Sequence, residues 1–230
     1  MMTTENHMTQ FEESLTDSHI VPIENNKQAE KNQDIALSTK ETIGRYKSYI
    51  NPAFTRLLRF ISGDVVELRA HGTIVEDTTG KKYIDCLGGY GVFNCGYSHP
   101  RVLEAVHFQL DQMALSSRAL FSHPLALLSE QLAKITPGNL RYSFICNSGA
   151  EAIEGALKLA RWYTGRSEII AMEGAFHGKT LGALSVSGRE IYKMDFKPLI
   201  PKVKHVPFGD LEALKDEVSK KTAAVLLEPI

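Results

Sequence analysis

Residues 141–161 constrain the fold of this chain more than any other stretch. An apolar run at residues 142–146 has the composition of a buried strand, and it breaks at Asn147, Ser148 and Gly149. A strong helix former begins at once with Ala150. A strand, a turn with a hydroxyl and a glycine, and then a helix N-terminus are how α/β proteins build an anion site, because free backbone N–H groups and the helix dipole point outward there. We therefore expect this turn to hold a phosphate group.

The same residues are equally typical of an ordinary helix start, with Asn147 or Ser148 as the N-cap and Glu151 in the first turn. Small side chains along the following helix favour the phosphate site, because they let the helix lie close to a sheet. These residues are Ala152, Gly155, Ala156 and Ala160.

Strands and helices alternate after residue 140. Apolar runs predict strands at residues 142–146, 168–172 and 223–227, and a weaker run predicts one near residues 203–206. Helical patterns between them fall at residues 150–163, 178–186 and 210–220. This order is typical of an α/β sheet that is largely parallel and whose strands are joined by crossover helices.

The composition along the chain predicts three regions. Residues 1–40 are rich in Glu, Gln, Asn, Thr and Lys, and we expect them to be a flexible polar extension. Residues 41–90 are expected to hold helices on both sides of a break at Asn51-Pro52, followed by a short β-hairpin around the turn at residues 78–81. Residues 91–230 begin with two amphipathic helices and continue as part of a large α/β domain.

The composition also argues against several classes of function. A net charge of −1 is unsuited to nonspecific nucleic-acid binding, which needs a basic face. No run approaches the ~18 apolar residues of a membrane span, and the histidines and cysteines lack the spacing of a metal site. The glycine-rich fingerprints of nucleotide-binding loops are missing as well. An odd number of cysteines and a polar N-terminus without a secretory signal lead us to expect a cytoplasmic protein.

Four further residues are candidates for a ligand site. Phe176 and His177 follow the strand at residues 168–172, where an aromatic ring could lie on a planar ligand, although a core phenylalanine and a loop histidine are the commoner outcome. Glu228 ends the last strand, where a carboxylate either faces the ligand crevice or simply precedes a turn proline. Tyr90 lies in a glycine-rich loop and could line a pocket or the core.

The last predicted strand stops almost at the carboxyl end of the chain. Ligands of open parallel sheets bind just beyond the carboxyl ends of the strands, and an unfinished sheet leaves an apolar edge exposed. We therefore expect this chain to be the N-terminal part of a longer protein.

Five motifs together resemble the class III aminotransferases, which are pyridoxal-phosphate enzymes of fold type I. They follow the family's order and spacing: VEDTTGKKYIDCLGG (75–89), NCGYSHP (94–100), NSGAEAIEGALKLAR (147–161), AFHGKTLGALS (175–185) and VLLEPI (225–230). The resemblance runs from about residue 45 onward. It implies an N-terminal segment plus the first half of the large domain, with an incomplete and mostly parallel sheet.

The resemblance implies a role for the turn described first. Ser148, Gly149 and Ala150 stand where the family holds the phosphate of pyridoxal 5'-phosphate. Threonine is common at the third position, so Ala150 removes one hydroxyl contact while keeping the backbone N–H.

It also implies roles for the other candidates. Phe176 stands where an aromatic side chain stacks on the pyridine ring, with His177 next to it. Glu228 is expected near the cofactor and the incoming amine, and Tyr90 on the substrate side. Lys179 is interpreted as a solvated lysine, and the lysine that forms the Schiff base is expected beyond Ile230.

The activity implied by the resemblance is transamination. Segments such as INPAF (50–54) and KHVPFG (204–209) are similar to class members that act on a terminal diamine such as putrescine, with a keto acid such as 2-oxoglutarate as the expected acceptor. Ornithine, acetylornithine or 4-aminobutyrate would be the donor in the alternative. The resemblance further implies a homodimer that binds small molecules and neither nucleic acid nor a membrane.

This chain by itself is expected to be inactive, since its catalytic lysine would lie beyond Ile230. A fragment with no catalytic role is the alternative from a different class of function.

Overall fold

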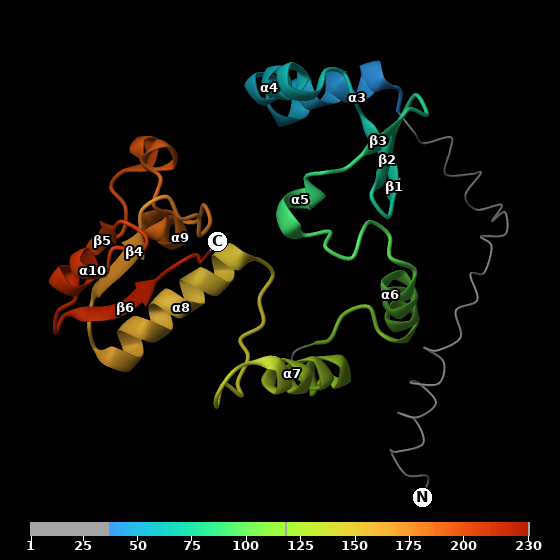
Figure 1. The fold of residues 1–230 in the computed structure, drawn as a ribbon. Helices are drawn as coiled ribbons and strands as arrows, with labels where there is room; N and C mark the ends of the chain where they lie inside the picture. Colours follow the sequence, from blue (N-terminus) through green and yellow to red (C-terminus); the bar gives the residue numbers. More distant parts are fainter. Residues whose placement is uncertain (1–36, 118, 230) are drawn as a thin grey trace, which may run out of the picture. The chain divides into compact units, whose positions relative to one another are not determined.

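The structure is a computed structural model that describes residues 37–117 and 119–229. Most of the polar extension expected at residues 1–40 lies outside the described residues. The chain divides into two compact units, Met1–Leu115 and Ser116–Ile230 (Figure 1). The region boundaries expected at residues 40 and 90 stay predictions.

The described part of the first unit starts with helices that are interrupted at Asn51. The side-chain oxygen of Asn51 accepts hydrogen bonds of 2.8 Å from the Ala53 N–H and 3.0 Å from the Phe54 N–H, and Pro52 is the first residue of the helix that follows. This N-cap confirms the break predicted from the sequence. The elements are α3 (Thr39–Arg45), a π-helical turn η1 (Tyr46–Ile50) and α4 (Pro52–Ser62).

A three-stranded antiparallel sheet follows, with the order β1 (Glu67–His71), β2 (Ile74–Asp77) and β3 (Lys82–Ile84). The turn between β2 and β3 is organised by the carboxylate of Asp77. It accepts hydrogen bonds from the N–H and hydroxyl of Thr79, the N–H of Lys81 and the hydroxyl of Tyr83. These bonds confirm the predicted hairpin.

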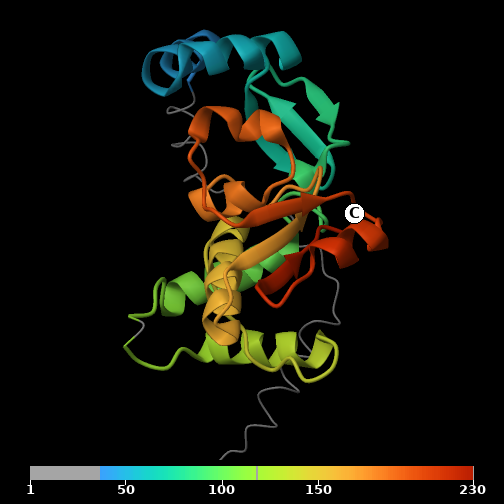
Figure 2. The same cartoon turned by 90° about the vertical axis from the view of Figure 1, so that its left-hand side faces the viewer.

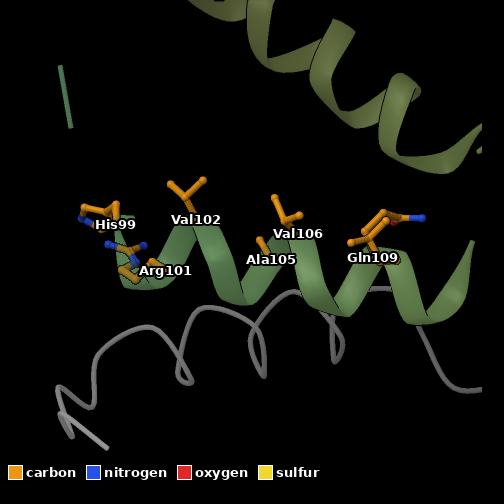
Figure 3. A pocket seen from close by; sticks show the side chains of 7 residues that line it. His99, Arg101, Val102, Ala105, Val106 and Gln109 are labelled. Carbon is orange, nitrogen blue, oxygen red and sulfur yellow. The ribbon is translucent and has the colours of Figure 1, made fainter. Parts of the chain in front are cut away.

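The glycine-rich segment after the hairpin forms the short α5 (Gly88–Gly91), and α6 (Pro100–Gln112) starts at the proline expected to begin a helix. One face of α6 borders a shallow pocket of about 590 Å³. Figure 3 shows Val102 and Val106 projecting from the same side of this helix. The pocket is lined by His99, Arg101, Val102, Ala105, Val106, Gln109 and Leu110, none of which is a predicted site residue.

The second unit holds the α/β part of the chain. Its first elements are α7 (His123–Ile135), α8 (Gly149–Thr164), β4 (Glu168–Met172) and α9 (Leu181–Val186). Two 3-10 turns, η2 (Glu190–Tyr192) and η3 (Met194–Phe196), lead to β5 (Val203–Val206), α10 (Leu211–Glu217) and β6 (Thr222–Leu226). The strand order is β5-β4-β6, and both pairs are parallel, as the alternation predicted.

The core of this unit lies on the two faces of β4, which is buried along its centre because it has a neighbour on each side. On one face, Ile169 and Ala171 pack with Leu157 of α8 and Val186 of α9. On the other face, residues of β4 and β5 pack against α10. Figures 1 and 2 both show α8 lying alongside the strands.

The strand predicted at residues 142–146 is wrong. Residues 141–146 have no regular secondary structure, and the side chain of Phe144 is 73% exposed. The outer strands β5 and β6 each pair only with β4 among the described residues. An extended segment becomes a strand only when a neighbour accepts and donates its backbone hydrogen bonds, and apolar composition cannot supply that neighbour.

None of the helices in the described ranges is long and apolar enough to cross a membrane.

Candidate functional site

The start of α8 is an N-capped helix. Ser148 has an extended backbone, and its hydroxyl oxygen accepts a 3.2 Å hydrogen bond from the N–H of Glu151. The carboxylate of Glu151 in turn accepts a 2.6 Å bond from the N–H of Asn147. The interpretation of this segment as a helix start with Ser148 as N-cap is therefore confirmed.

The cap leaves donors free for a ligand. Among the described residues, no acceptor binds the backbone N–H groups of Gly149 and Ala150. A Cβ on Gly149 would have no neighbour within 4 Å, so the space in front of the turn is open. Two free N–H groups, the Ser148 hydroxyl proton and the dipole of a 16-residue helix together suit an anion.

The loop after β4 lies against this turn. Gly178 lies in it with a φ of +124°, and a Cβ there would be 2.7 Å from the Cβ of Ala150 and 3.1 Å from that of Ala183. This close approach needs glycine. The structure therefore brings the segment that contains Phe176 and His177 next to the turn at Ser148.

Phe176 is held at the edge of the sheet and is not a core residue. Its side chain is 46% exposed. Its backbone N–H donates a 2.9 Å hydrogen bond to a carboxylate oxygen of Glu228, just beyond β6. The ring of Tyr192 meets the Phe176 ring edge-on, with 6.2 Å between centroids. These contacts position the ring while leaving much of it accessible to a planar ligand.

His177 is buried, and its Nε2 has no hydrogen-bond partner among the described residues. Its backbone N–H donates to the hydroxyl of Ser187 over 3.0 Å. Burial lowers the pKa of the imidazole below its usual value, the charge of Glu228 opposes this, and His205 adds to it. A buried neutral ring with an unused nitrogen is suited to a hydrogen bond with a bound polar group.

Two other residues singled out from the sequence, Lys179 and Tyr90, are both exposed. Lys179 is exposed, and its Nζ lies 5.9 Å from the centroid of the Tyr192 ring. Tyr90 belongs to the first unit, where its backbone is left-handed with a φ of 57° and its side chain is 90% exposed. The substrate role expected for Tyr90 stays a prediction.

Sequence reasoning missed three residues that organise this region. Ser187 and Tyr192 contact His177 and Phe176, and Glu154 joins α8 to the start of α9. Each makes its contact across 10 or more residues of chain, so no local pattern indicates it.

Comparison with known protein families shows which family this chain belongs to. The model of the class-III aminotransferases matches residues 62–230, which is well over half of the chain. The chain belongs to the class-III aminotransferases. The cofactor of these aminotransferases is pyridoxal 5'-phosphate, and the open helix turn, the exposed Phe176 ring and the unused Nε2 of His177 fit its phosphate, ring and polar substituents.

Two relatives of this aminotransferase chain are about twice its length. It is 42% identical to the putrescine aminotransferase of Pectobacterium atrosepticum, over 94% of this chain and 51% of that protein. An (S)-enantioselective omega-transaminase from Thermomicrobium roseum has a TM-score of 0.73 at 28% identity, over 83% of this chain and 49% of that one. The chain thus spans about half the length of the relatives it matches.

The ornithine aminotransferase of Toxoplasma gondii shares the fold, with a TM-score of 0.74 at 24% identity over 90% of this chain and 49% of its own.

Proposed function

We propose that this chain forms the phosphate-binding part of a transaminase that moves an amino group from a terminal diamine, putrescine, to a keto acid such as 2-oxoglutarate. The observation that carries the proposal is the open, capped turn at Ser148, which lies beside the loop that holds Phe176. The 42% identity to a putrescine aminotransferase favours the diamine.

The residues have separate tasks in this proposal. The hydroxyl of Ser148 and the N–H groups of Gly149 and Ala150 bind the phosphate, and the ring of Phe176 stacks on the pyridine ring. The Nε2 of His177 hydrogen-bonds a polar group of the cofactor, since nothing else described satisfies it. When bound, the cofactor supplies an electron sink for the carbon that carries the amino group.

Glu228 connects the cofactor site with the donor. One carboxylate oxygen is bound to the Phe176 N–H, and the exposed side chain remains a negative charge at the mouth of the site. A dication such as putrescine gains from this charge. A carboxylate that serves the cofactor instead is the alternative, and it would affect all donors equally.

The lysine that forms the Schiff base is proposed to lie outside this site. Lys179 is the lysine nearest to Phe176 and His177 in the sequence. Its side chain is exposed, and its Nζ lies over the ring of Tyr192. We therefore expect borohydride treatment of this chain with pyridoxal phosphate to give no adduct specific to one lysine. A single modified lysine in the peptide map would contradict this. A cytoplasmic homodimer remains part of the proposal.

A donor panel tests the function. The intact protein that carries this chain is assayed with putrescine, ornithine, acetylornithine and 4-aminobutyrate, each with 2-oxoglutarate. We expect the highest kcat/KM with putrescine. Activity with another donor and none with putrescine would support the alternative within the class, and no turnover of any donor would support a non-catalytic role.

A further inference from the structure

Glu154, on the second turn of α8, binds the start of α9. Its Oε1 accepts three hydrogen bonds: 2.6 Å from the Thr180 hydroxyl, 2.8 Å from the Gly182 N–H and 3.3 Å from the Ala183 N–H. Thr180 is the N-cap residue of α9, yet its own side chain makes no capping bond. A carboxylate from another helix therefore caps α9 in its place.

This contact is tightly packed. Gly182 is buried, and a Cβ at that position would collide with the carboxylate of Glu154. Gly178 also approaches Ala150 closely, with 2.7 Å between a would-be Cβ and the Ala150 Cβ. Residues 178–183 are thus attached to the first two turns of α8 at two places.

The attachment joins the two halves of the proposed cofactor site. Ser148 begins α8 six residues before Glu154, and Phe176 precedes Thr180 by four residues in the loop that Glu154 holds. A ligand with a phosphate group at one end and a flat ring at the other contacts both the Ser148 turn and the Phe176 ring. It can do so only when the distance between the two matches the length of the ligand. A carboxylate that touches neither end of the ligand still determines that separation.

We propose that Glu154 is a positioning residue that sets the distance between the anion-binding turn at Ser148 and the ring of Phe176. The inference rests on the proposed function, because it takes pyridoxal phosphate as the ligand. It predicts that Glu154 matters for a ligand that spans both halves and does not matter for one that occupies the turn alone.

Binding to the cofactor-free intact protein tests this. For Glu154→Ala we expect the affinity for pyridoxal phosphate, followed by its absorption spectrum, to fall about 10- to 100-fold, by analogy with the loss of residues that orient the ligands of a metal site. The affinity for inorganic phosphate, measured by calorimetry, should stay within about twofold. Glu130→Ala is the matched control, because Glu130 pairs with Lys134 on the surface of α7 and with no other cation among the described residues.

The conservative variant separates positioning from charge. All three bonds end on Oε1, so Glu154→Gln keeps an acceptor for each of them and should bind pyridoxal phosphate within about threefold of the original protein. If Glu154→Ala does not fold by circular dichroism, Thr180→Val removes only the 2.6 Å bond and should show a smaller loss of the same kind.

A double-mutant cycle completes the test. Glu154→Ala should cost much less affinity in a Phe176→Ala background, since its effect acts through that ring. Equal losses for pyridoxal phosphate and inorganic phosphate, or additive losses with Phe176→Ala, would overturn the role of Glu154. Failure of the original protein to bind pyridoxal phosphate would instead overturn the proposed function, and the inference with it.

Discussion

Phe176 donates its backbone N–H to the carboxylate of Glu228 over 2.9 Å, although the two residues are 52 positions apart in the chain. Phe176 follows β4 and Glu228 follows β6, and these strands are parallel neighbours. Because parallel strands end at the same edge of a sheet, the loop and the carboxylate meet where ligands of such sheets bind. The hydrogen bond therefore holds the Phe176 ring and the Glu228 carboxylate close together at this edge.

The charge of Glu228 acts on His177. It raises the pKa of that imidazole against the lowering effect of burial, so Glu228→Gln should lower the His177 pKa further. The amide still offers an oxygen to the Phe176 N–H, so the loop should keep its position. Titration of the His177 ring by NMR measures the change. Glu212→Gln, which alters an exposed pair with Lys215, should leave the His177 titration unaltered.

Stability should depend on pH through buried His177 and half-buried His205. Burial is the main reason that the pKa values of His177 and His205 are lowered. Below about pH 6.5 the unfolded chain then binds protons that the folded chain does not, so stability falls as the pH falls through the window down to the lowered pKa values. Urea unfolding between pH 5 and 8 measures this slope.

His177→Gln should flatten that slope, whereas His107→Gln, which replaces an exposed ring on α6, should not. If the slope of stability against pH is unchanged in His177→Gln, His177 does not contribute to the pH dependence of stability.

Gly178→Ala should destabilise the second unit by about 3 kcal/mol, because it combines an unfavourable φ of +124° with a contact of 2.7 Å to Ala150. Gly174→Ala is the matched variant. It has a φ of +79° and open space around its Cβ, so about 1 kcal/mol is expected from backbone strain alone. Urea denaturation gives both values, and equal costs would show that the contact with Ala150 is unimportant.

Ser148→Ala should cost about 1 kcal/mol of stability, because the Glu151 N–H loses its acceptor. Ser122 holds the corresponding position at α7 but makes no capping bond with its side chain, so Ser122→Ala should change the unfolding midpoint little. A similar loss in both variants would mean that the Ser148 cap contributes nothing of its own.

Most elements of the second unit were predictable from local patterns. Glu168–Met172 and Val203–Val206 begin and end where the sequence predicts, although the second run is only weakly apolar. Residues 142–146 carry a similar apolar pattern and remain irregular. These residues differ from β4 and β5 because no neighbouring strand pairs with them among the described residues.

The candidate site also combines features that local sequence predicts with contacts that it does not predict. The helix start at Ser148 and Gly149 depends on capping and on glycine geometry, which involve only neighbouring residues. The amino-acid sequence alone therefore predicts it. The contacts of Phe176 with Glu228 and Tyr192, and those of Glu154 with α9, join residues far apart in sequence.

The sequence by itself determined where the turn of residues 147–149 lies, which helix follows it and which family the motifs resemble, because these depend on residues within one or two turns of each other. Only the tertiary structure decided that Gly178 lies on Ala150, that the Nε2 of buried His177 has no partner among the described residues and that Glu154 holds the loop. Those outcomes follow from how the helices pack on the sheet, and packing depends on the whole chain at once.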